Sequence, residues 1–106
     1  MKTSKKKLRE LIEEGTIDCY GEDEQFSGMA TMLEDNVDCP FQAKVVGEEV
    51  TVTGFKWPKY GFDLKAVCER KGKKHLVDVG SLELIKPYPD GYEWIEAFLF
   101  WRDGAE

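Results

Sequence analysis

The stretch that decides the fold is FQAKVVGEEVTVTGFKW, which runs from Phe41 to Trp57. Within it, Val50 and Val52 alternate with Thr51 and Thr53. Successive side chains of a strand point to opposite faces, so an alternation of apolar and polar residues is typical of β-structure with one buried face. We therefore expect antiparallel strands to begin at this point of the chain.

Two glycines divide the strand-like region. Gly47 lies in VGEEV and Gly72 lies in ERKGKKH, each between two strand-like runs, which is typical of hairpin turns. The runs FDLKAVCERK and KHLVDVGSLEL continue the pattern. Short consecutive strands predict a small curved antiparallel sheet, or an SH3-like barrel, of four to five strands within residues 41–85.

Helical patterns flank this region on both sides. Apolar residues at helical spacing predict one helix from about Ser4, its N-cap, to Glu14, and a second from about Asp23 to Glu34. A third, unusually apolar helix is predicted over residues 91–102, with Asp90 at its N-cap, and we expect it to pack against the sheet. The predicted fold is a single α+β domain over residues 1–106, with a helical acidic segment 1–38, a sheet 41–85 and a C-terminal helix 91–102.

The charges of this chain are strongly segregated. From Glu10 to Ala43 there is no Lys, Arg or His, and there are ten acids. The formal charge of −6 therefore divides into −10 in this third of the chain and +4 in the rest. Like charges crowded on one folded surface repel each other, so the segregation favours a bound cation or a basic partner. A solvated acidic face is the alternative interpretation.

The acids around the second helix are the candidate cation ligands. Glu34 and Asp35 lie at its predicted C-terminal end, where the helix dipole disfavours negative charge, and Asp38 follows closely. We expect these three acids to form the main site together with acids brought near from Asp18 to Glu24. Acids at the N-terminal end are favoured by the dipole, so helix capping and ligation are equally good explanations for them. The complete candidate set is Asp18, Glu22, Asp23, Glu24, Glu34, Asp35 and Asp38, and Glu13 and Glu14 join it if the first helix packs alongside.

Hard divalent cations such as Ca²⁺ prefer oxygen ligands of this kind. The site is not an EF-hand, because a loop that begins at Asp35 has Val37 at its third position and one that begins at Asp18 has Tyr20 there. Mg²⁺ is the other metal that these ligands suit, although it demands tighter octahedral geometry.

Other classes of function fit the sequence poorly. A phosphate-binding glycine loop and a nucleophile elbow are both missing, and the single His75 lies beside two lysines, so we expect no enzyme activity. The overall acidity argues against nucleic acid, and no run of about 18 apolar residues predicts a membrane helix. The N-terminal MKTSKKKLRE has no apolar region after it, and three widely spaced cysteines match no disulfide framework. We expect a cytoplasmic monomer.

Three segments together resemble a known family. They are CYGEDEQFSGMATMLEDNVDCPFQAKVVGEEVTVTGF from Cys19 to Phe55, AVCERKGKKHLVDVGSLEL from Ala66 to Leu84, and YEWIEAFLFWR from Tyr92 to Arg102. The pattern is similar to that of the cyanobacterial CcbP-type calcium-binding proteins. The resemblance implies an intracellular calcium binder, buffer or sensor without EF-hands. The acids inside the matching segment Cys19–Phe55 are then the candidate ligands, and they include Glu48 and Glu49. The alternative from another class is an acidic interaction module that binds a basic protein.

Overall fold

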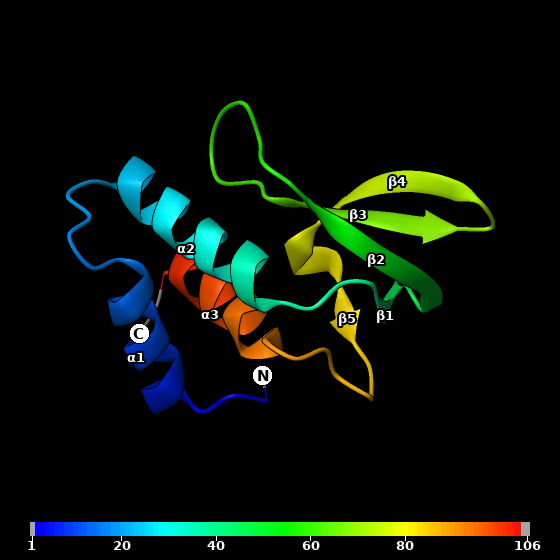
Figure 1. The fold of residues 1–106 in the computed structure, drawn as a ribbon, viewed down its shortest axis with the longest axis horizontal. Helices are drawn as coiled ribbons and strands as arrows, with labels where there is room; N and C mark the ends of the chain where they lie inside the picture. Colours follow the sequence, from blue (N-terminus) through cyan, green and yellow to red (C-terminus); the bar gives the residue numbers. More distant parts are fainter. Residues whose placement is uncertain (1, 105–106) are drawn as a thin grey trace. The chain divides into compact units, whose positions relative to one another are not determined.

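The computed structural model describes residues 2–104 (Figure 1). The elements in chain order are α1 (Lys5–Gly15), α2 (Glu22–Asn36), β1 (Phe41–Val45), β2 (Glu48–Lys56), β3 (Lys65–Arg70), β4 (Lys73–Asp78), the short 3₁₀ helix η1 (Val79–Ser81), β5 (Glu83–Leu84) and α3 (Tyr92–Arg102). The fold class is α+β, as the sequence predicts. Among residues 2–104, no helix combines the length and the apolar composition needed to cross a membrane.

The five strands form one antiparallel sheet in the order β4-β3-β2-β1-β5. Of the two architectures that the sequence allows, the open sheet is the one that forms, and within the described residues the barrel does not close. Its two edges are β4 and β5, and β5 consists of only two residues, Glu83 and Leu84, which pair with β1. A strand of this length has too few backbone groups to pair on both sides and complete a barrel.

Both predicted hairpin turns are confirmed. Val46 and Gly47 join β1 to β2 with φ of 49° and 77°, and Lys71 and Gly72 join β3 to β4 with φ of 52° and 77°. Two successive residues with positive φ match the twist of the flanking strands, which is why two-residue hairpin loops use them. The turns fix the register, in which Cys68 lies opposite His75.

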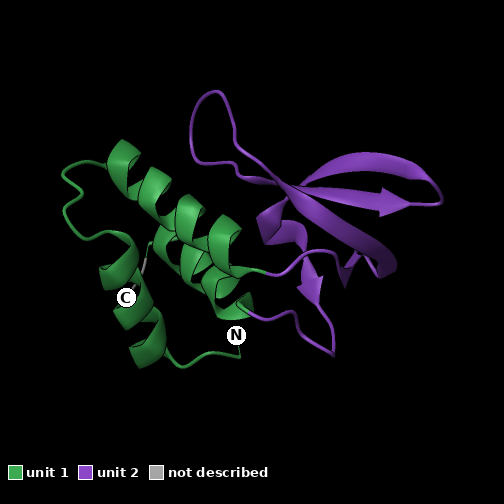
Figure 2. Ribbon diagram, in the orientation of Figure 1, with its two compact units in different colours: residues 1–37, 91–106 green, residues 38–90 purple. Residues whose placement is uncertain are grey.

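The chain divides into two compact units, shown in Figure 2. The helical unit comprises residues 2–37 and 91–104, and the sheet unit comprises residues 38–90. The three α-helices thus belong to one unit, and the five strands belong to the other.

Within the helical unit, the packing partners of α3 are α1 and α2, and its packing against the sheet stays a prediction. The helix α3 is apolar on more than one side, so it can pack against two helices at once. Its buried apolar residues include Trp94, Ile95, Ala97 and Phe98. The ring of Phe98 meets that of Phe26 in α2 edge-on, with centroids 5.8 Å apart.

The start of α3 differs from the prediction. Its N-cap is Gly91, with φ 85°, and not Asp90. A Cβ atom on Gly91 would lie 1.9 Å from the carbonyl oxygen of Asn36, so the approach of the two chain segments admits only glycine.

One buried carboxylate ties the start of α1 to α3. Glu96 is only 7% exposed, and its two oxygens accept hydrogen bonds from the backbone amides of Lys2 and Thr3, each at 2.8 Å. Ser4 then caps α1, as the sequence predicts, by accepting a hydrogen bond from the amide of Lys7.

Candidate functional site

The length of α2 separates the predicted ligands. Glu22, Asp23 and Glu24 occupy its first turn, whereas Glu34 and Asp35 lie near its other end. At 1.5 Å rise per residue, about 20 Å of helix axis lies between Glu22 and Asp35. Ligands of one Ca²⁺ all lie within about 2.6 Å of the ion, so the predicted site that combines both ends of α2 is wrong for a single chain.

Asp38 lies just after the end of α2, in the sheet unit. There it lines a hollow of about 360 Å³ together with Gln42 and Thr51, whose side chains are hydrogen-bonded to each other at 2.8 Å. The backbone amide of Asp38 donates a hydrogen bond to the carbonyl of Asp90. This bond brings the backbone of a second acid, Asp90, next to that of Asp38, and Asp90 was not among the predicted ligands.

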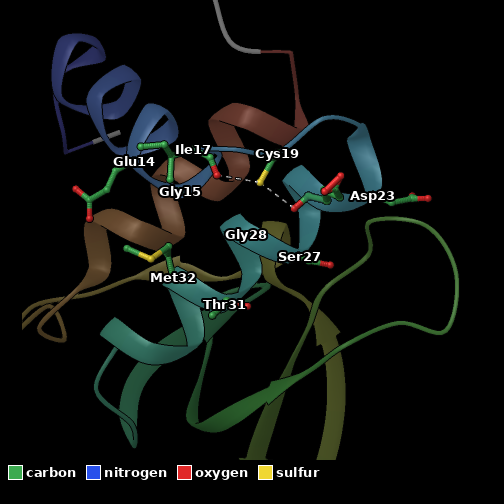
Figure 3. Close-up of a pocket in the computed structure, with 10 residues that line it drawn as sticks. Glu14, Gly15, Ile17, Cys19, Asp23, Ser27, Gly28, Thr31 and Met32 are labelled. Carbon is green, nitrogen blue, oxygen red and sulfur yellow. Dashed lines mark hydrogen bonds between the residues drawn. The ribbon is translucent and has the colours of Figure 1, made fainter.

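A larger open groove, of about 600 Å³, lies in the helical unit where α1 ends beside α2 (Figure 3). It exists because the two helices approach closely at two glycines: a Cβ atom on Gly28 would lie 2.2 Å from the carbonyl oxygen of Gly15. The groove is lined by Glu14, Gly15, Ile17, Cys19, Asp23, Glu24, Ser27, Gly28, Thr31 and Met32.

Three of these lining side chains are carboxylates, from two elements. Glu14 belongs to the last turn of α1, and Asp23 and Glu24 belong to the first turn of α2. Figure 3 shows Glu14 and Asp23 on opposite sides of the groove, with Cys19 between them. The Sγ atom of Cys19 lies 3.6 Å from the carbonyl oxygen of Ile17 and 3.4 Å from that of Glu24, and its single proton can be donated to either of them.

The field in the groove is negative. None of the lining residues is basic, and the last turn of α1 contains no basic residue that would compensate its carbonyl end. The C-terminal end of a helix has a partial negative charge, so the end of α1 and the carboxylates both make the electrostatic potential in the groove more negative. The groove therefore attracts cations.

The carboxylates are not assembled into a finished site. Among residues 2–104, no three His, Cys, Asp or Glu side chains are grouped closely enough to hold a metal ion. Glu14, Asp23 and Glu24 are all exposed, and exposed side chains change rotamer within nanoseconds. Asp18 lies in the loop before α2, exposed and with φ 60°.

The groove adds ligand atoms that the sequence analysis did not anticipate. Ser27 and Thr31, which both have hydroxyl groups, lie one helical turn apart on the same face of α2 and line the groove. Their spacing of four residues was visible in the sequence, but nothing in it indicated that this face of α2 meets the end of α1.

The chain matches no protein-family model and no curated protein sequence. Its fold is similar to that of Anabaena CcbP, with a TM-score of 0.79 and 20% identity over 100% of this chain and 98% of that chain. It is also similar to a calcium-binding protein solved in its calcium-binding form, with a TM-score of 0.70 and 22% identity over 95% of this chain and 94% of that chain. The chain therefore has the fold of Anabaena CcbP, and the resemblance seen in its sequence is confirmed at the level of the fold.

Proposed function

We propose that this chain binds Ca²⁺ through exposed carboxylates, without an EF-hand, and that the primary site is the groove between α1 and α2. The observation behind this proposal is that Glu14, Asp23 and Glu24 line one groove in which no base is present. The neighbour in fold that is described as a calcium-binding protein supports the same ligand.

The chemistry of the groove suits Ca²⁺ better than Mg²⁺. Ca²⁺ accepts six to eight oxygens at about 2.3–2.6 Å in irregular geometry, and carboxylates, hydroxyls, backbone carbonyls and water all serve. Mg²⁺ requires a near-ideal octahedron at about 2.0–2.1 Å, which mobile side chains on two separate helices supply poorly. A groove open to solvent also leaves room for the waters that complete the coordination.

The role we propose is that of a cytoplasmic calcium buffer or sensor and not of an enzyme. The lining of the groove combines three carboxylates with Ser27 and Thr31 and includes no histidine that could act as a base. A binding site of this kind changes its occupancy with the calcium concentration and needs no substrate.

Calorimetric titration of the metal-free protein tests this function. We expect CaCl₂ to give a saturable isotherm and MgCl₂ to give a much weaker one under the same conditions. Binding of neither ion, or equal binding of both, would contradict the proposal.

A second candidate function is an acidic interaction module, and one specific observation favours it. Ile17 and Tyr20, in the loop before α2, are 72% and 88% exposed among acids. Exposed apolar side chains beside charge of one sign are suited to a protein partner of opposite charge. Calorimetry separates the two functions, because this one requires no metal.

A further inference from the structure

The sheet unit has a hollow of about 200 Å³ on one face of the sheet. Its floor consists of Val45, Val50, Val77 and the thiol of Cys68. Cys68 is 1% exposed, and loss of hydration raises the pKa of its thiol, so this group stays neutral. The floor is therefore apolar and uncharged.

The rim of this hollow carries basic side chains and one acid. Arg70 and His75 line it, and Lys73 lies directly opposite Arg70 in the antiparallel register, so its side chain shares the same face. The single acid in the lining, Glu48, is paired with Arg70 at 2.6 Å, so these two charges offset each other and Lys73 adds a net positive charge to this face. An apolar floor with a basic rim suits a ligand that has an apolar side chain next to acids.

The chain itself contains a segment with that chemistry. In the loop between α1 and α2, Ile17 is 72% exposed and is followed by exposed Asp18. Tyr20, which is 88% exposed, precedes Glu22 and Asp23. The whole span from Glu10 to Ala43 contains no base, so this loop is the apolar and acidic counterpart of the hollow.

We propose that the hollow on the sheet is a docking site for a second copy of this chain, whose loop inserts Ile17 between Arg70, Lys73 and His75. The loop and the hollow are different surfaces, so the contact is head-to-tail. Each copy has one loop and one hollow and can bind one neighbour through each of them. The proposal replaces the expected monomer with a weak, concentration-dependent assembly, and it does not depend on calcium binding.

Lysines on an edge strand have another explanation, which is that they discourage edge-to-edge pairing of sheets. This accounts for Lys73 and Lys74 equally, because both are on the edge strand β4. It does not account for the apolar floor of the hollow. The two lysines point to opposite faces of the sheet, which makes them a matched pair for an experiment.

Sedimentation velocity at rising concentration, in buffer with EDTA, tests the proposal. At about 0.1 M salt the Debye length is about 10 Å, so the net repulsion between two acidic copies is screened while contacting charges still attract. We expect the average mass of the wild type to rise as the concentration approaches 1 mM, a range chosen for weak association. A constant monomer mass would overturn the proposal, and EDTA keeps that result independent of the proposed calcium site.

Variants then locate the two surfaces. Lys73→Glu/His75→Ala should weaken association at least about tenfold, as should Ile17→Ser, because each removes a central contact. Lys74→Glu/Leu76→Ala, on the opposite face of the same strand, should leave association unchanged. Tyr60→Ser, which removes another exposed large side chain, should also leave it unchanged. Thermal melting of each variant confirms that it is folded. Equal weakening by the control variants would overturn the assignment.

A mixing experiment gives the decisive result. Lys73→Glu/His75→Ala retains an intact loop, and Ile17→Ser retains an intact hollow. Each variant alone should remain a monomer, whereas an equal mixture should form a dimer of one copy each and grow no further. A mixture that stays monomeric would show that the loop and the hollow do not bind each other.

Discussion

A Cβ atom added to Gly28 would lie 2.2 Å from the carbonyl oxygen of Gly15. The backbones of α1 and α2 therefore touch at this point, and the groove with Glu14, Asp23 and Glu24 opens beside the contact. Because the obstructing atom belongs to the backbone, a side chain at residue 28 cannot be accommodated by a rotamer change.

Gly28→Ala should consequently lower the free energy of unfolding by about 1–3 kcal/mol, the usual cost of overpacking. This is opposite in sign to the gain of about 1 kcal/mol that alanine brings to an unconstrained helix. Chemical denaturation measures the change. Gly54→Ala is the control, since nothing lies within 4 Å of a Cβ atom there. A stabilised Gly28→Ala variant would show that the helices do not cross at this distance.

Calcium should raise the thermal stability of the protein more than NaCl of equal ionic strength does. A ligand that binds only the folded state adds about 2.7 kcal/mol at a hundredfold excess over its Kd, whereas screening of the acids is similar for any salt. Thermal melting followed by tryptophan fluorescence measures both effects. Identical shifts with the two salts would contradict specific calcium binding.

The two ends of α2 should respond differently to neutralisation. Asp23→Asn/Glu24→Gln should weaken calcium binding and also destabilise the metal-free protein, by about 0.3–1 kcal/mol per charge, since acids stabilise a helix N-terminus. Glu34→Gln/Asp35→Asn should leave calcium binding nearly unchanged and stabilise the metal-free protein by a similar amount, about 0.3–1 kcal/mol per charge.

This ranking reverses the one expected from the sequence, in which Glu34, Asp35 and Asp38 form the main site. Calorimetry with melting of the metal-free variants distinguishes the two. Loss of calcium affinity in Glu34→Gln/Asp35→Asn, with retention in Asp23→Asn/Glu24→Gln, would restore the original ranking.

The thiol of Cys39 reports whether calcium binds at Asp38. Loss of hydration and, as the smaller cause, the Asp38 carboxylate raise the pKa of Cys39. A cation on Asp38 would cancel its negative potential, lower the pKa of the thiol and increase the thiolate fraction at pH 8. Alkylation of Cys39 by iodoacetamide should therefore be unaffected by calcium if the groove is the only site.

Asp38→Asn provides the reference for that measurement, because it should lower the pKa of Cys39 without metal and speed alkylation. If calcium speeds alkylation of the wild type to the rate of Asp38→Asn, and has no effect on that variant, Asp38 is a calcium ligand.

Glu96→Gln should destabilise the protein by about 1–3 kcal/mol, because charge-assisted hydrogen bonds to the amides of Lys2 and Thr3 are lost and one amide is left without an acceptor. The effect should appear first as faster hydrogen exchange at the start of α1. Exchange that accelerates uniformly along the chain would show that Glu96 has no local role there.

The sequence was sufficient for features that depend on neighbours along the chain. The alternation at Val50 and Val52 correctly predicted a strand, and Gly47 and Gly72 correctly predicted two hairpin turns. Ser4 was correctly predicted as the N-cap of α1. Each follows from the geometry of a few consecutive residues, whatever the rest of the molecule does. The separation of Glu22 from Asp35 also follows from the length of the helix between them, although the site expected from the sequence combined acids from both ends of that helix.

Only the tertiary structure decided which surfaces meet. By its composition, an apolar helix such as α3 can pack on a sheet or on other helices, and within its own unit it packs on α1 and α2. Likewise, the sequence placed Glu14 and Asp23 on separate helices, but their common groove required the contact between Gly15 and Gly28. The reason is physical: burial of apolar surface is favourable without regard to direction, so the partner is chosen by close packing of the whole chain and not by any local pattern.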